Sequence, residues 1–217
     1  MASVYKQTTH PHLKKLKNKV WAQILIIYTR YLIGATFLFA SLIKIKGRRF
    51  TTQSGADYPI DSAWHLFETL YQSGLYWQFI GIGQLFAGFM LMTQRYAKLG
   101  ALLFLPIIGN IFVITLSYYF AYTPVITGMM LAANLLLVAW DWDELKILIG
   151  KKPAFDDSFR LEDHKIWEWI GLVIFAFTFT YRLLIDQYDI AFWASICFLI
   201  GASGLVIGIK SYSKKDS

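Results

Sequence analysis

Residues 21–45 read WAQILIIYTRYLIGATFLFASLIKI, and the rest of the chain is best understood from this stretch. It exceeds the roughly 20 apolar residues that a helix needs to cross a hydrocarbon core of about 30 Å. Arg30 lies well inside the stretch. A charge at the bilayer centre costs roughly 2.5–3.5 kcal/mol on insertion scales, so Arg30 is expected to face partners or a cavity within a helical bundle.

Five further hydrophobic stretches follow in this chain of 217 residues, which is 56% apolar, 18% aromatic and only 16% charged. Soluble domains rarely have such a composition. The sequence therefore predicts an all-α, polytopic membrane protein with a four-helix transmembrane bundle and a C-terminal two-helix hairpin. The six spans are predicted at residues 21–46, 74–93, 99–120, 124–140, 167–185 and 190–209.

The net charge of +7 does not mark a nucleic-acid-binding domain, because the Lys and Arg residues lie beside the ends of the hydrophobic stretches. With the N-terminus inside, fifteen of these 21 residues fall in cytoplasmic segments and five outside. This bias predicts that both termini are cytoplasmic, and we expect a bacterial-type inner (plasma) membrane. The run from Lys44 to Arg49 is the one discordant element.

The predicted organisation has two membrane units joined by a polar segment. Short turns near residues 93–98 and 121–124 force neighbouring spans to run antiparallel, whereas residues 141–166 are polar and mixed in charge. We expect this connector to decouple the hairpin, which would pack on the outside of the bundle. The predicted parts are a basic leader (1–20), the bundle (21–140), the cytoplasmic connector (141–166), the hairpin (167–209) and a tail (210–217).

A short interfacial helix is predicted before the second span. From Asp61 the sequence reads DSAWHLFETLYQS, with aromatic and apolar residues at helical spacing. Asp61 or Ser62 would cap its first turn.

Polar residues recur at comparable depth in the first four spans and predict the functional site. Arg30, Gly34, Phe37, Ser41 and Lys44 form one stripe, since a helix turns by about 100° per residue. The candidate ligand-binding residues are Arg30, Ser41, Lys44, Gln84, Asn110 and Asn134. The alternative is that these side chains only bridge helices, at roughly 0.6–2 kcal/mol for each hydrogen bond.

No carboxylate lies well inside these four spans to accept from Arg30. Asp141 and Asp143 come closest, and we expect them to be solvated at the end of the fourth span or paired with Lys98. Arg30 would then need carbonyls, amides, water or a ligand as acceptors.

Other patterns predict no cofactor of their own. His65 and Glu68 have a spacing that suits metal ligation but no second ligand pair, so no metal site is predicted. Haem is not expected, because the remaining histidines lie outside the spans, and the lone Cys197 excludes an intramolecular disulfide. Gly201, Gly204 and Gly208 form a small-residue ridge that favours helix packing or a homo-oligomer.

The pattern resembles the DoxX-like family of small four-helix membrane proteins. The resemblance rests on the first-span stripe and on residues 81–106, GIGQLFAGFMLMTQRYAKLGALLFLP, and covers roughly residues 24–140. It implies an accessory or quinone-interacting subunit of a membrane redox system, with quinone as the ligand and a redox subunit as the partner. The chain departs from the family by Ser41 where a glycine is usual, by its two additional spans, and by lacking the cysteine pairs of thiol-processing relatives.

Two other functions stay open. One is a non-enzymatic assembly or scaffolding protein whose polar layer only holds the bundle together. The other is a small-solute transporter, although the expected pair of broken helices is missing from the sequence. No catalytic constellation is recognisable, so the sequence leaves enzymatic activity undecided.

Overall fold

The computed structural model describes residues 15–154 and 160–213, so the predictions for most of the leader and for residues 214–217 lie outside the described residues. Within these ranges every regular element is helical, and six helices are long and apolar enough to span a membrane. They are α2 (Val20–Ile45), α4 (Leu75–Met92), α5 (Ala97–Ser117), α6 (Thr123–Trp140), α8 (Lys165–Leu184) and α9 (Ile190–Ser213). The prediction of an all-α, polytopic membrane protein with six spans is confirmed.

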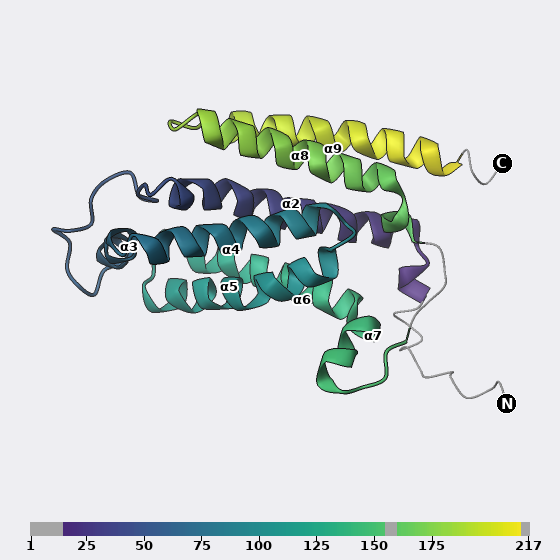
Figure 1. Cartoon of the computed structure of the whole chain (residues 1–217), viewed down its shortest axis with the longest axis horizontal. Helices are drawn as coiled ribbons and strands as arrows, with labels where there is room; N and C mark the ends of the chain where they lie inside the picture. Colours follow the sequence, from purple (N-terminus) through teal and green to yellow (C-terminus); the bar gives the residue numbers. More distant parts are fainter. Residues whose placement is uncertain (1–14, 155–159, 214–217) are drawn as a thin grey trace.

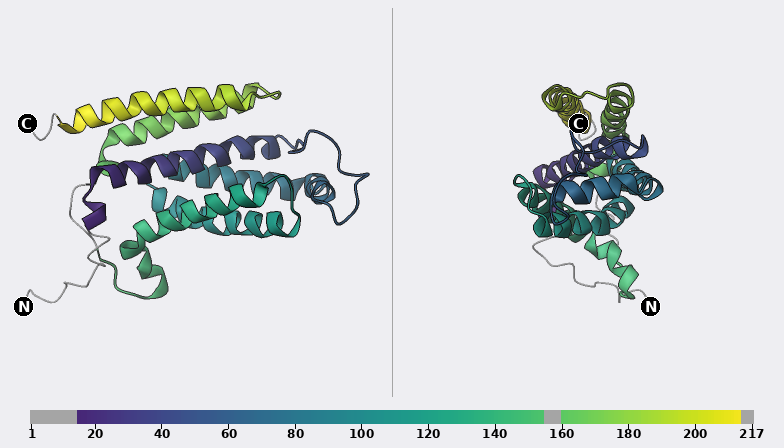
Figure 2. Two further views of the ribbon diagram at one scale, coloured as in Figure 1. Left: turned by 180° about the vertical axis from the view of Figure 1, so that it is seen from behind. Right: turned by 90° about the vertical axis from the view of Figure 1, so that its left-hand side faces the viewer.

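Helix α2 lies at the centre of the molecule (Figure 1). The group of α4, α5 and α6 packs on one side of it, and the hairpin of α8 and α9 lies along the other (Figures 1 and 2). The apolar window of α2 is 56% buried, against 11% for α9. Helix α2 therefore joins the two groups, whereas α9 is left with the large apolar surface expected of a lipid-facing helix.

The helices alternate in direction, so α2 begins and α9 ends at the same end of the bundle (Figure 1). We call this the Arg30 end, and the opposite end the Lys44 end. Which end faces the cytoplasm stays a prediction.

Small residues bring α2 and α4 close together and set their register. A Cβ on Gly88 would lie 2.8 Å from the carbonyl oxygen of Gly34, and one on Gly81 would lie 2.9 Å from that of Ser41. Larger side chains would push the two backbones apart, as in other small-residue contacts between membrane helices. This antiparallel register places Gln84 opposite the segment between Gly34 and Ser41.

Two hydrophobic clusters share α2. One lies toward α4, α5 and α6, where the Phe37 and Phe104 rings meet with centroids 3.9 Å apart. The other lies toward the hairpin, where Tyr31 packs with Trp167 and donates a hydrogen bond to its carbonyl oxygen. The hairpin thus packs closely on the central helix, although autonomy of residues 21–140 stays a prediction.

The glycine ridge of α9 faces into the molecule. Gly204 would place a Cβ 2.9 Å from Ile170, and Gly208 would place one 2.6 Å from the Trp167 ring. Gly201 lies against Tyr28, whose hydroxyl donates to the Gly201 carbonyl oxygen over 2.7 Å. Of the two roles expected for this ridge, helix packing is confirmed within the chain, whereas a homo-oligomer through Gly201, Gly204 and Gly208 stays a prediction.

The predicted short helix is present as α3 (Ala63–Gln72), which crosses the Lys44 end and is seen end-on in Figure 1. Ser62 is its N-cap and accepts from the backbone N–H of His65 over 3.2 Å. The prediction of a capped helix from local spacing is confirmed. The connector also contains helical turns, α7 (Trp142–Leu145), η1 (Lys146–Ile149) and η2 (Leu161–Asp163).

Candidate functional site

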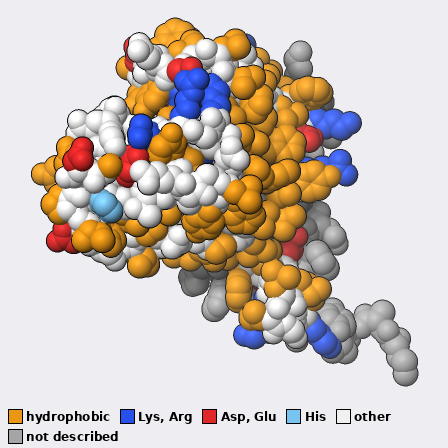
Figure 3. Space-filling model, turned by 60° about the vertical axis from the view of Figure 1, so that its left-hand side comes forward, with side chains coloured by type: hydrophobic (Ala, Val, Ile, Leu, Met, Phe, Trp, Pro, Cys, Tyr) orange, Lys and Arg blue, Asp and Glu red, His pale blue; other side chains and the backbone are white. Residues whose placement is uncertain are grey.

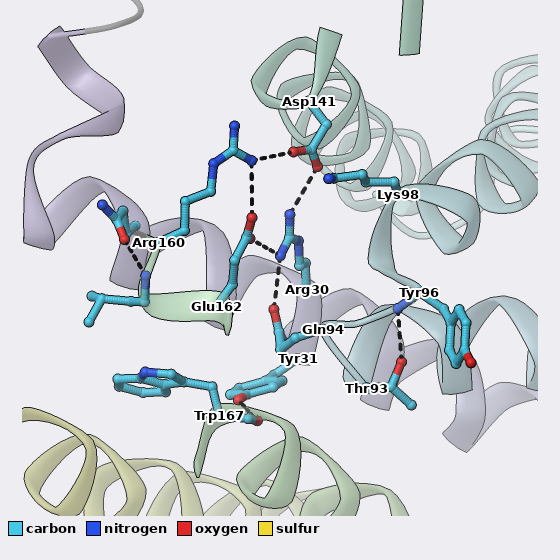
Figure 4. Close-up of polar contacts among 12 residues, drawn as sticks. Arg30, Tyr31, Thr93, Gln94, Tyr96, Lys98, Asp141, Arg160, Glu162 and Trp167 are labelled. Atoms are coloured by element: carbon cyan, nitrogen blue, oxygen red, sulfur yellow. Dashed lines mark hydrogen bonds and ion pairs between the residues drawn. The ribbon is translucent and has the colours of Figure 1, made fainter. Parts of the chain in front are cut away.

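Arg30 lies in a buried ionic cluster at the Arg30 end of the bundle (Figure 4). Its Nη2 donates to Asp141 over 2.9 Å, and its Nη1 donates to Glu162 and to Gln94, the latter over 3.0 Å. The guanidinium is only 1% exposed. The expectation that Arg30 lacks carboxylate acceptors is therefore wrong.

Asp141 was expected to be a solvated helix-end carboxylate, and this is also wrong. Helix α6 ends at Trp140, and the following turn directs Asp141 toward α2, leaving its side chain 1% exposed. The second carboxylate partner of Arg30 is Glu162, which comes from η2, 132 residues from Arg30 along the chain. A search for acids within the spans misses both residues.

Arg160 completes the cluster. Its Nη1 lies 3.4 Å from Asp141 and 3.2 Å from Glu162, so two guanidinium groups face two carboxylates. We call Arg30, Gln94, Asp141, Arg160 and Glu162 the Arg30 cluster. Its formal charges balance, which is the condition under which buried charges are tolerated.

The two acids respond differently to this environment. Burial raises the pKa of the Asp141 carboxyl, against the opposing effect of Arg30. Burial alone would also raise the pKa of Glu162, but Arg30 and Arg160 together hold it below its usual range.

Gln94 was not predicted as a site residue. It lies in the turn between α4 and α5 with φ at 57°, a left-handed conformation that non-glycine residues rarely adopt. Such a conformation costs about 1–3 kcal/mol and persists where the surroundings enforce it. Here the turn directs the Gln94 side chain under Arg30, where its Oε1 accepts from the guanidinium.

A second, separate feature is a cavity of about 510 Å³ bounded by α2, α4, α5 and α6, with α3 contributing at the Lys44 end. This volume is in the range of small-molecule sites, about 300–1,000 Å³. Three predicted site residues line it, namely Lys44, Gln84 and Asn110. The walls are otherwise mainly apolar, with a few threonines.

Lys44 supplies a buried amino group to this cavity. Its Nζ donates to the carbonyl oxygen of Ala40 over 2.8 Å and lies 4.8 Å and 5.1 Å from the ring centroids of Phe50 and Trp77. The residue is 7% exposed, and no carboxylate of the described residues lies within ion-pair distance. Both rings lie within the distance of a cation–π contact.

Gln84 is the second polar group of interest in the cavity lining. It is 2% exposed, and its Oε1 has no hydrogen-bond partner among the described residues. A buried acceptor without a donor costs about 1–3 kcal/mol. Asn110 lines the same cavity and is exposed.

The remaining predicted site residues lie elsewhere. Ser41 donates to the Leu38 carbonyl oxygen over 2.8 Å within α2, and Asn134 donates to Ala101 of α5 over 3.1 Å. Neither lines the cavity. Of the residues expected to form one polar layer, Gln84 and Asn110 thus line the cavity, whereas Arg30 and Asn134 do not. Fourteen residues of α2 separate Arg30 from Lys44, a rise of about 21 Å at 1.5 Å per residue.

Glu68, considered above with His65 for a metal, is held by Arg49 instead. The guanidinium donates twice to the carboxylate, over 2.8 Å each, and this contact holds the pKa of Glu68 at about 2. The ring Nδ1 of His65 lies 3.1 Å from the carbonyl oxygen of Tyr58. The described residues contain no group of three His, Cys, Asp or Glu side chains placed to hold a metal.

No family model, curated protein or solved structure matches the chain. The DoxX-like resemblance thus rests on the first-span stripe and the motif at residues 81–106, and it stays a prediction.

Proposed function

We propose that this polytopic membrane protein binds a quinone or quinol in the α2–α4–α5–α6 cavity and serves as an accessory subunit of a membrane redox system. One observation carries the proposal. A mainly apolar cavity of about 510 Å³ is lined by a buried ammonium, on Lys44, and by Gln84, whose amide oxygen has no donor among the described residues.

These two groups complement a quinone head. The Lys44 ammonium has protons beyond the one given to Ala40, and a quinone carbonyl oxygen accepts from such a donor. The Gln84 Oε1 accepts from a quinol hydroxyl after a small rotation of the amide. The helix register places Gln84 near the level of Ala40, so one ring can reach both groups.

The rest of the cavity suits the remainder of such a ligand. Its walls come from apolar and aromatic side chains of four spanning helices, which match an isoprenoid tail. A quinone is dissolved in the bilayer and would enter laterally between helices. A partner subunit would exchange electrons with it, and the inner membrane with both termini in the cytoplasm is the proposed setting.

The test is quinone binding by the full chain in detergent, with Lys44→Met as the variant. Lys46→Met is the matched control, because it makes the same change two residues away, where the ammonium contacts Leu183 and Asp186 of the hairpin instead. We expect quinone to co-purify with the wild type and the control, and Lys44→Met to lose it while unfolding at a similar temperature. Bulk lipid alone in the wild type would contradict the proposal.

A scaffolding role is the second candidate, and the Arg30 cluster favours it. The cluster is buried and charge-balanced, although Gln94 and Glu162 also border a cavity of about 310 Å³, and it joins α2, the α4–α5 turn, the end of α6 and η2. Such an arrangement holds helices together without a ligand. If Lys44→Met supports growth fully in a complementation assay while disruption of the Arg30 cluster does not, scaffolding replaces quinone binding.

A further inference from the structure

Helix α7 and the turn η1 form a segment that leaves the bundle sideways. Residues 142–149 run across the direction of the spanning helices at the Arg30 end, and the view along the bundle shows them projecting beyond it (Figures 1 and 2). We call residues 142–149 the side arm. An element with this direction at the end of a membrane span lies parallel to the membrane plane.

Ion pairs fix one face of the side arm to the bundle. Asp143 lies 3.0 Å from the Lys17 ammonium, and Glu144 contacts Lys98 and lies 3.6 Å from Arg160. Leu145 is buried between these contacts. Both carboxylates of the side arm are thereby turned toward the bundle, which fixes the orientation of its other face.

The other face is apolar and exposed. Ile147, Leu148 and Ile149 are 56%, 66% and 57% exposed, and Trp142 is 44% exposed. In Figure 3 the side arm is the lowest coloured part of the molecule, where orange apolar side chains lie between blue basic ones. The connector at residues 141–166 was predicted to be polar and mixed in charge. That prediction does not account for the exposed apolar residues of the side arm.

A basic residue follows the apolar tip. Lys151 comes directly after the turn at Gly150 and is exposed, whereas Lys146 is only 13% exposed and lies 3.7 Å from Asp143, a carboxylate that faces the bundle. The outward side of the arm thus combines an apolar tip with a cation. An anionic bilayer surface offers the complementary pair, acyl chains beside phosphates.

We propose that the side arm is an interfacial wedge that binds the surface of an anionic phospholipid bilayer. Ile147, Leu148 and Ile149 enter the boundary between head groups and acyl chains, about 5–10 Å deep. Trp142 lies at head-group level, where tryptophan is enriched, and Lys151 contacts lipid phosphates. The wedge fixes the depth and rotation of α6 relative to the membrane, and it does not depend on what the cavity binds.

The test places a fluorophore on the wedge of the full chain in lipid nanodiscs. Leu148→Cys in a Cys197→Ser background gives one labelling site, and Asp163→Cys is the control, because Asp163 is exposed at the same end of the bundle. We expect blue-shifted emission at position 148, with stronger quenching by a nitroxide near the top of the acyl chain than by one near its end. If the label at position 148 emits at as long a wavelength as the label at position 163 and is equally unquenched, the proposal is overturned. The apolar face of the side arm would then be assigned to a protein partner.

A second measurement isolates Lys151. Nanodiscs of phosphatidylcholine alone are compared with nanodiscs that also contain phosphatidylglycerol, with and without Lys151→Gln. We expect a larger blue shift in the anionic lipid for the parent chain, and a smaller difference between the two lipids in the variant. Equal emission of the parent chain in both lipids would overturn the assignment of Lys151 to lipid phosphates.

Discussion

Replacement of Arg30 by leucine tests the account of the Arg30 cluster most directly. Arg30→Leu leaves the carboxylate of Asp141, which is 1% exposed, facing an apolar side chain. Removing one partner of a buried ion pair costs about 3–5 kcal/mol, since the other charge stays desolvated. Arg160 still contacts both carboxylates, so we expect a loss near 3 kcal/mol. That corresponds to a change of roughly a hundredfold in the folding equilibrium.

The assay is thermal unfolding of purified variants in detergent, followed by tryptophan fluorescence. Arg95→Leu is the matched control, because Arg95 is exposed in the neighbouring turn and its guanidinium lies 5.4 Å from the centroid of the Tyr96 ring. A surface change of this kind is expected within about 0.5 kcal/mol of the wild type. Adding Asp141→Asn to Arg30→Leu removes the stranded charge and should recover part of the loss.

The loss should also depend on pH. In Arg30→Leu the pKa of the Asp141 carboxyl rises further, because burial opposes its charge and Arg30 no longer compensates. A raised pKa in the folded state means that the contribution to stability is present at acid pH and is lost as pH rises through that pKa. The variant should therefore approach the wild type in acid. Stability of Arg30→Leu equal to the wild type at neutral pH would refute the account.

Two further variants probe the packing. Because Arg49 lowers the pKa of Glu68 to about 2, the pair stabilises the folded state above the ordinary carboxyl pKa, and this contribution is lost as pH falls through about 2. Glu68→Gln should make the loop before α3 more sensitive to limited proteolysis at neutral pH. It should also remove the loss of stability at acid pH. Unchanged cleavage would contradict a stabilising Arg49–Glu68 pair. Gly204→Leu drives a side chain into Ile170 and should cost about 1–3 kcal/mol in thermal unfolding, whereas Gly109→Leu, with open space around it, should cost less. Equal effects of the two glycine variants would show that the ridge is not packed as described.

Local properties of the chain could be predicted from the sequence alone. The length of each apolar stretch determines whether a helix can span the hydrocarbon core, and this property predicted six spans. Capping by Ser62 depends only on residues within one helical turn, so α3 was also predictable. Lys44 and Gln84 were recognisable as site candidates, because polar side chains inside apolar spans require a polar or enclosed environment.

Contacts between distant segments were decided by the tertiary structure alone. Asp141 and Glu162 lie 111 and 132 residues from Arg30, in a helix end and a short turn whose positions no periodic pattern specifies. The helical period places Arg30 and Lys44 on one face of α2. Their axial separation and the packing of the other helices nevertheless assign Arg30 to a buried ionic cluster and Lys44 to an open cavity. In the same way the sequence showed the glycine ridge, and only the packing of α9 on α8 decided that it faces inward. The sequence determines which face of each helix can be buried. Which other helix covers that face depends on the packing of all the helices together.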